Sequence, residues 1–99
     1  MTLEYIHKKF TDGQLGIKCS NNDERTFIFD YGNEVLGLPK ASLSTYNPNY
    51  PYVAYLFGSI VGWNGYWSGE APEKITFNDF ICAVNKQQED DIIGVEELL

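Results

Sequence analysis

The amino-acid sequence predicts an α+β domain, in which a helix covers one face of an antiparallel sheet of about four strands. Residues 77–88 carry apolar side chains at helical spacing, whereas residues 14–19 and 25–31 have the composition of strands. Asn64-Gly65, between aromatic residues, is a strong signal for a β-hairpin. The chain of 99 residues has the length of one domain, so residues 1–99 are expected to fold as a single unit.

A short helix is expected near the N-terminus. Leu3, Ile6 and Phe10 recur at helical spacing. Thr2 before them is a favourable N-cap residue, and Asp12-Gly13 would end the helix. A strand is the alternative assignment for this segment.

Two strands are expected next, at residues 14–19 and 25–31. The residues between them, 20–23, are Ser, Asn, Asn and Asp, all of which favour turns. In the second segment Phe27 and Phe29 alternate with their neighbours at the period of two that is typical of a sheet strand.

The segment 41–69 contains no charged residue and holds eight of the fifteen aromatic residues of the chain. Its first part, residues 46–51, is rich in Pro, Asn and Tyr and is expected to be an extended loop. Residues 53–63 are apolar without a clear period, so they form a buried strand or a buried helix, and the Asn-Gly pair that follows favours the strand. Gly58 or Gly62 would then mark a bulge or a bend.

The helix at 77–88 has the clearest signals in the chain. Thr76 and Asp79 approximate a capping box at its start, with Asp in place of the usual Glu. An apolar stripe follows at the spacing i, i+3, i+4 and i+7, formed by Phe77, Phe80, Ile81 and Val84. Beyond this helix, residues 92–95 are expected to form a last short strand and residues 96–99 a helical turn.

The formal net charge of the chain is −7, from 14 acidic and seven basic residues. The imbalance lies mainly in residues 70–99, which hold eight acids and only two lysines. Direct binding to nucleic acid or to an anionic membrane surface is disfavoured, because both depend on Lys and Arg. A protein partner with a basic surface is compatible with this charge, although the same charge also serves solubility.

The cysteines and the N-terminus indicate a cytoplasmic protein. Cys19 and Cys82 are far apart in the sequence and are expected to be reduced, buried thiols. The first residues lack the apolar core of a signal peptide. A membrane span needs roughly 20 apolar residues, and prolines, glycines and asparagines interrupt the charge-free segment well before that length.

The sequence contains no recognisable catalytic, cofactor-binding or metal-binding motif. His7, the only histidine, lies beside two lysines and is expected to face solvent. The glycines around Ser59 are not at the positions that a hydrolase nucleophile elbow requires. The acidic groups near the C-terminus lack the spacing of a calcium loop, and there is neither a His/Cys cluster for zinc nor a phosphate-binding glycine motif. We therefore expect a protein that is not an enzyme and has no cofactor.

Aromatic and acidic residues are the remaining candidates for function. Tyr and Trp are enriched among the residues that dominate binding energy at protein interfaces. Trp63 and Tyr66 would face each other across the expected hairpin, with Trp67 on the other face. The structural alternative is that these rings form core and a cross-strand pair that stabilises the sheet. The candidate partner-binding residues are Tyr46, Tyr50, Tyr52, Trp63, Tyr66, Trp67, Glu89, Asp90 and Asp91.

These features favour a small acidic inhibitor that binds a protein partner and blocks a basic site, such as that of a nuclease or another nucleic-acid-acting enzyme. Phage proteins that counter host defence, acting in the host cytosol, and immunity proteins against toxins share this composition. One alternative is a binder of a nucleotide- or sugar-like ligand in an aromatic pocket. Phosphorylated ligands would then need a cation at the site, from among Lys8, Lys9, Lys18 and Arg25. The other alternative is an accessory subunit whose aromatic patch is an oligomer interface.

Overall fold

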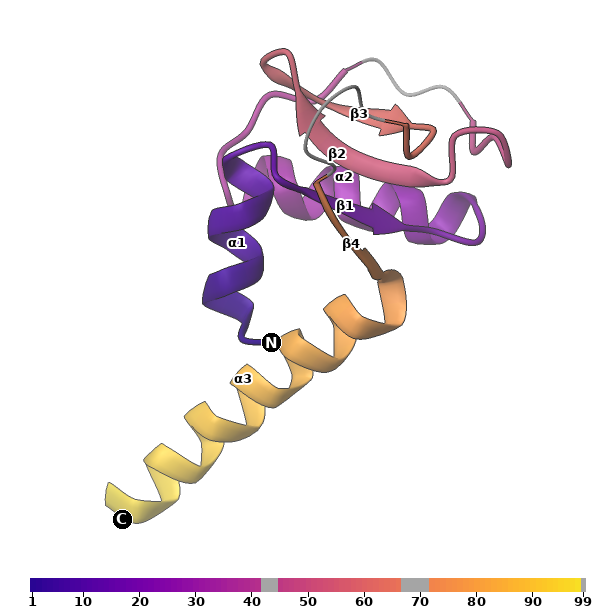
Figure 1. Ribbon diagram of the computed structural model, residues 1–99. Helices are drawn as coiled ribbons and strands as arrows, with labels where there is room; N and C mark the ends of the chain where they lie inside the picture. Colours follow the sequence, from indigo (N-terminus) through magenta and orange to yellow (C-terminus); the bar gives the residue numbers. More distant parts are fainter. Residues whose placement is uncertain (42–44, 67–71, 99) are drawn as a thin grey trace.

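The computed structural model describes residues 1–41, 45–66 and 72–98, with side chains described as far as Gln87. The elements are α1 (Leu3–Thr11), β1 (Leu15–Lys18), α2 (Asn22–Glu34), β2 (Tyr52–Leu56), β3 (Ser59–Trp63), β4 (Glu73–Thr76) and α3 (Phe77–Leu98). Within these described ranges three helices accompany a four-stranded sheet (Figure 1). The α+β class expected from the sequence is therefore confirmed.

Helix α1 forms where the sequence predicts a short helix. The Thr2 side-chain oxygen accepts a hydrogen bond from the Tyr5 backbone N–H at 3.1 Å, which caps the helix. Ile6 and Phe10 lie on one face and are buried in the core. The chain then turns at Gly13, whose φ of +73° suits glycine, and enters β1.

The strands are ordered β3-β2-β1-β4, and the sheet is mixed rather than purely antiparallel. β1 pairs antiparallel with β2 and parallel with β4, while β2 and β3 form an antiparallel hairpin. Ile17 in β1 consequently lies between Val53 and Ile75. The parallel pairing is possible because α2 and the hairpin lie between β1 and β4 in the chain and provide the long connection that parallel strands require.

Residues 25–31 belong to α2, so the strand expected there is wrong. Asn21 caps this helix by accepting a hydrogen bond from the Glu24 N–H at 2.9 Å. Phe27, which together with Phe29 suggested a strand by alternating with its neighbours, is 43% exposed. The buried positions recur at i, i+3, i+4 and i+7, and they are Arg25, Ile28, Phe29 and Gly32. This stripe is hard to recognise in the sequence because two of its members are an arginine and a glycine.

Residues 53–63 are strands rather than a helix, and they span most of a hairpin whose turn is Phe57-Gly58. Both turn residues have positive φ, +55° and +80°, which is the pattern of a type I′ turn. Gly58 therefore lies in the turn and does not mark a bulge. The Trp63–Tyr66 pair expected across Asn64-Gly65 does not form, because Tyr66 lies in no strand and Trp63 pairs with Tyr52. Trp67, which follows in the expected hairpin, lies outside the described residues.

Helix α3 begins at the predicted capping box. The Thr76 N–H donates to Asp79 Oδ2 and the Asp79 N–H donates to Thr76 Oγ1, both at 3.0 Å. The hydrogen bond from the Thr76 backbone N–H, and after it the Thr76 hydroxyl, hold the pKa of the Asp79 carboxyl below its usual value. The helix continues to Leu98 instead of ending near residue 88, so the strand expected at 92–95 is wrong. No proline interrupts this stretch, and its second half extends away from the sheet (Figure 1).

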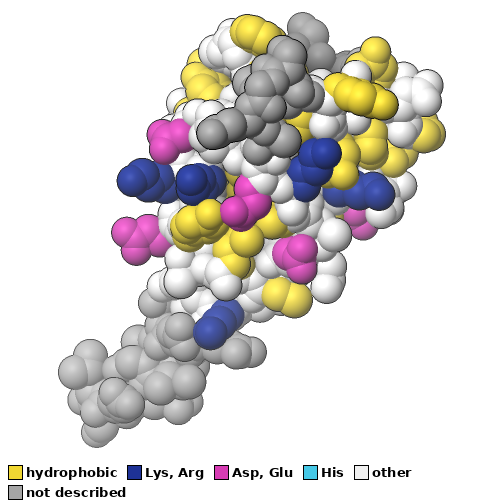
Figure 2. Space-filling model, in the orientation of Figure 1, with side chains coloured by type: hydrophobic (Ala, Val, Ile, Leu, Met, Phe, Trp, Pro, Cys, Tyr) yellow, Lys and Arg dark blue, Asp and Glu magenta, His cyan; other side chains and the backbone are white. Residues whose placement is uncertain are grey.

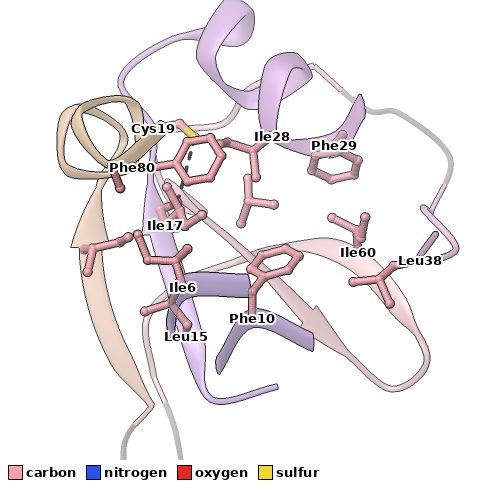
Figure 3. Packing of buried hydrophobic residues seen from close by; sticks show 13 residues of the cluster. Ile6, Phe10, Leu15, Ile17, Cys19, Ile28, Phe29, Leu38, Ile60 and Phe80 are labelled. Atoms are coloured by element: carbon pink, nitrogen blue, oxygen red, sulfur yellow. Dashed lines mark hydrogen bonds between the residues drawn. The ribbon is translucent and has the colours of Figure 1, made fainter. Parts of the chain in front are cut away.

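The main core lies between one face of the sheet and the helices (Figure 3). Its members include Ile6, Phe10, Leu15, Ile17, Cys19, Ile28, Phe29, Leu38, Ile60 and Phe80. Cys19 is buried as expected, whereas Cys82 on α3 is exposed, so the expectation that both thiols are buried is wrong for Cys82. In the described part of the chain, none of the helices combines the length and the apolar character needed to cross a membrane.

Candidate functional site

The binding residues expected from the sequence lie in different places. Tyr46 and Tyr50 line a cavity beside α2. Tyr52 and Trp63 lie on the sheet face opposite the main core, because side chains alternate along each strand. The acidic residues 89–91 lie on the second half of α3. Among the described side chains, the structure brings Tyr46 and Tyr50 together at the cavity, and it brings Tyr52 and Trp63 together on the opposite sheet face.

The cavity has a volume of about 590 Å³ and is formed by α2, the loop at 45–50 and β3. Small-molecule sites commonly have volumes of about 300–1,000 Å³. The lining residues are Arg25, Thr45, Tyr46, Asn47, Pro48, Tyr50 and Gly62. They combine one cation with aromatic rings, hydroxyl groups and an amide, so the cavity can contact both a charged group and a ring.

Arg25 is the buried charge of this cavity. It is 5% exposed, and its guanidinium carbon lies 4.2 Å from the centroid of the Phe29 ring. Burial lowers the pKa of the guanidinium, which still remains protonated at neutral pH. The sequence offers four cations for an anionic ligand, and of these Arg25 lines the cavity whereas Lys8, Lys9 and Lys18 do not. The pattern Asn21-x-x-Glu24 just before it, typical of a helix start, is the signal that would have placed Arg25 on a helix.

The loop over the cavity is held by hydrogen bonds to its backbone. The Tyr46 N–H donates to Asn22 Oδ1 at 3.0 Å, which ties the loop to the first turn of α2. Asn47 accepts two further hydrogen bonds, both at 2.9 Å. The Asn49 N–H donates to the Asn47 side-chain oxygen, and the Tyr50 N–H donates to the Asn47 backbone carbonyl. The two tyrosines are therefore presented at the cavity by a defined turn.

On the opposite sheet face, Trp63 is packed rather than presented to solvent. It is 6% exposed, and its ring lies against Gly16 of β1. Tyr52, its direct partner across the strands, lies 5.4 Å away between ring centroids. Lys74 Nζ lies 5.7 Å from the Trp63 ring centroid. Trp63 thus forms a cross-strand aromatic pair, with Tyr52 in the place that the sequence assigned to Tyr66.

Several aromatic rings do face solvent. Tyr50 is 50% exposed and Tyr66 is 84% exposed, while Trp67 lies outside the described residues. Phe57, at the hairpin tip, is 98% exposed and has a φ of +55°. A left-handed conformation costs a residue other than glycine roughly 1–2 kcal/mol. Sequence reasoning missed Phe57 because it assigned the hairpin turn to Asn64-Gly65.

His7 contacts Tyr31 and is partly buried, so the expectation that it faces solvent is wrong. Nε2 of His7 lies 2.7 Å from Tyr31 Oη, a hydrogen bond between α1 and α2. Burial lowers the pKa of His7 and raises the pKa of Tyr31. This pair therefore contributes to the packing of the two helices in its neutral form.

The reactive side chains that the structure describes do not form a metal or thiolate centre. Among the residues with described placement, His, Cys, Asp and Glu do not gather in any group of three that could hold a metal ion. Burial is the main cause that raises the pKa of the Cys19 thiol to about 12, so it stays protonated at neutral pH. Cys82 is exposed on α3.

Charge is divided unevenly between the domain body and the end of the chain. Residues 1–87 hold nine acidic and seven basic residues, whereas residues 88–99 hold five acidic residues and no basic one. Figure 2 shows basic and acidic side chains intermingled over one face of the body. Most of the net charge of −7 therefore belongs to the C-terminal segment.

No protein-family model matches the chain, and no match is found among curated proteins or solved structures. Two features are suited to recognition: the acidic second half of α3, and the cavity that contains Arg25.

Proposed function

We propose that this protein acts by binding another protein, and that the acidic second half of α3 occupies a basic site on that partner. The partner is a nuclease or another nucleic-acid-acting enzyme, whose substrate groove is basic because it contacts phosphates. The protein is then a non-enzymatic inhibitor or neutraliser, of the kind that phages direct against host defence or that protects a cell from a toxin.

The observation that supports this proposal most is the place of the acidic residues in the fold. Net charge serves solubility without having to be gathered in one segment. The body is close to neutral, and the excess lies on the part of α3 that extends away from the sheet (Figure 1). The acidic residues there are Glu89, Asp90, Asp91, Glu96 and Glu97. A charged element that projects from its domain is suited to enter a groove of opposite charge.

The sequence of this helical segment also contains the apolar residues that a stable contact needs. Ile92, Ile93 and Val95 lie between the two groups of acidic residues, and Leu98 follows the second group. Complementary charge mainly raises the rate of encounter and makes it sensitive to salt. Burial of an aliphatic side chain contributes about 1.5–3 kcal/mol. Steering by the acids and burial of the aliphatic residues thus complement each other in one element.

Tyr66 is a second contact candidate. Its ring is 84% exposed, and its carbonyl accepts a hydrogen bond from the Trp63 indole N–H at 2.8 Å. Asn64 Oδ1 accepts another from the Tyr66 N–H at 2.9 Å. The ring is therefore presented from a held backbone, which reduces the entropy lost when it contacts a partner.

The test is affinity capture from a lysate of the cell in which the protein acts, followed by assay of the captured enzyme. The helix variant combines Glu89→Lys, Asp90→Lys and Asp91→Lys. A matched control combines Glu4→Lys, Asp12→Lys and Glu34→Lys, which changes the net charge equally but on exposed positions of the body. Circular dichroism checks that both variants fold.

We expect wild type and the body control to retain one stoichiometric partner at low salt and to inhibit its nuclease or other nucleic-acid-directed activity. The helix variant is expected to lose both properties. The proposal fails if no stoichiometric partner is retained at low salt, or if retention and inhibition are the same for the helix variant as for wild type.

A further inference from the structure

The cavity beside α2 is a second recognition feature, independent of the end of α3. Its volume of about 590 Å³ is enough for a molecule of nucleotide size. Its walls come from a helix, a loop and a strand that are distant in the sequence. None of its lining residues belongs to α3, so its role is separate from the proposed contact with a protein partner.

Arg25 gives this cavity a specific chemical preference. A guanidinium presents five N–H donors in one plane, a geometry that matches the paired oxygens of a carboxylate or a phosphate. Packing on Phe29 at 4.2 Å orients this plane. Arg25 is 5% exposed, and electrostatic attraction to an anion is stronger at a buried cation than in open solvent.

The charge and a tyrosine converge on one point of β3. A Cβ built on Gly62 would lie 3.9 Å from Arg25 Nη2 and also 3.9 Å from Tyr50 Cβ. Tyr46 and Tyr50 are held at the rim by the hydrogen bonds from their N–H groups to Asn22 and Asn47. The cavity thus has a cation and aromatic rings in one preformed space.

We propose that this cavity binds a small anion that carries a planar ring, with its phosphate or carboxylate on the Arg25 guanidinium and its ring against the loop that carries Tyr46 and Tyr50. The size of the cavity fits a nucleoside monophosphate or an aromatic acid. Stacking on an aromatic side chain contributes about 1–3 kcal/mol for a nucleic-acid base, so one or two rings suffice for measurable affinity. The acidic charge of the chain opposes anion binding little, because most of it lies on the part of α3 that extends away from the domain (Figure 1).

The experiment is titration of the 15N-labelled full-length protein with small anions, and NMR chemical shifts monitor binding. The probes are AMP and benzoate, and their neutral counterparts are adenosine and benzamide. We expect AMP or benzoate to shift the amide signals of Gly62 and of residues 45–50, except Pro48, which has no N–H, in a saturable way. The neutral counterpart should bind at least about tenfold more weakly, since hydrogen bonds to a charged group are worth about 1.5–3 kcal/mol.

Variants distinguish binding at this cavity from non-specific binding elsewhere on the protein. Arg25→Met should weaken anion binding about tenfold or more. Because the buried Arg25 also packs in the fold, Tyr50→Ala serves as the second variant; Tyr50 is 50% exposed, so its loss should leave the fold intact while weakening binding. Tyr66→Ala is the matched control, since it removes an exposed tyrosine outside the cavity.

The proposal is overturned if neither anion shifts these signals at about 5 mM. It is also overturned if charged and neutral probes bind equally, or if Tyr50→Ala and Tyr66→Ala have the same effect. If Arg25 instead binds an acidic side chain of a protein partner, AMP and benzoate will have no effect. That result would assign the cavity to a protein interface.

Discussion

The indole of Trp63 lies directly on Gly16, so that a Cβ on Gly16 would come within 2.5 Å of the ring atom Cζ3. Trp63 is at the end of the edge strand β3, and Gly16 is two strands away, in β1. The ring therefore reaches across β2, where the small residue Ala54 is 1% exposed. Small residues on β1 and β2 make the space in which the largest side chain of this sheet face is buried.

The first prediction concerns this contact. Gly16→Ala is expected to lower the free energy of unfolding by about 1–3 kcal/mol, because the added methyl overlaps the indole and forces it to shift. Urea denaturation followed by tryptophan fluorescence measures the change. Gly62→Ala is the matched control: its nearest contact would be 3.9 Å, so a change within about 0.5 kcal/mol is expected. Equal stability of the two variants would show that the indole is not held on Gly16.

The second prediction concerns Phe57 in the hairpin turn. Phe57→Asn is expected to raise the free energy of unfolding by about 0.5–1 kcal/mol, because Asn tolerates positive φ in a type I′ turn better than Phe does. Little packing is lost, since the ring is 98% exposed. Phe57→Ala keeps the strained Cβ and should remain close to wild type. A loss of stability in Phe57→Asn, measured by urea denaturation, would mean that the ring contributes packing after all.

The third prediction is a pH dependence that arises from His7. Burial disfavours the imidazolium, so the pKa of His7 is lower in the folded chain than in the unfolded chain. The unfolded chain therefore binds more protons between the two pKa values, and stability rises with pH across that interval. The contribution is complete above the unfolded value of about 6.5 and is lost as the pH falls through the folded value.

Comparison of wild type with His7→Gln isolates this contribution from those of the carboxylates. Thermal unfolding between about pH 5 and about pH 7.5 should show a steeper loss of stability on acidification in wild type than in the variant. Proton NMR of the imidazole should give a pKa below the usual range. Tyr31→Phe removes the 2.7 Å hydrogen bond while keeping the ring, and tests whether burial alone lowers the pKa. An identical slope in wild type and His7→Gln would contradict the prediction.

The fourth prediction concerns the two thiols. Cys82 is exposed, whereas Cys19 is buried with a thiol pKa raised to about 12. An aromatic disulfide reagent should therefore label one thiol per native chain rapidly and the other about 100-fold or more slowly, because only the thiolate reacts. Both should react at once in denaturant. Cys82→Ser should remove the fast phase, and its persistence in that variant would show that Cys19 is accessible.

Sequence reasoning works best in this chain where the signal is local. Thr2 and Thr76 both cap helices as the sequence predicts, because an N-cap hydrogen bond involves residues only three positions apart. The charge pattern is equally local, and it identifies the acidic end of the chain without a structure. What it cannot show is that residues 92–95 continue α3, since a short β-branched run fits either a strand or a buried helix.

Long-range features are decided only by the tertiary structure. Phe27 and Phe29 have strand-like spacing. The segment is nevertheless helical, because Ile28 and Phe29 are both buried in the core from α2. The Asn-Gly pair is an equally strong local hairpin signal, but the chain places its hairpin turn at Phe57-Gly58. Preferences of this kind amount to about 1 kcal/mol or less, so burial of a few large side chains overrides them.

The sequence by itself determined the α+β class, the helices at both ends of the chain, the first strand and the acidic C-terminal segment. Only the tertiary structure decided that Ile17 lies beside Ile75 in a parallel pair and that Arg25 meets Tyr46 and Tyr50 at a cavity. The physical reason is that caps and periodicity act within one or two turns of chain. Strand partners and cavity walls depend on contacts between residues that are distant in sequence, whose free energy appears only when the whole domain is packed.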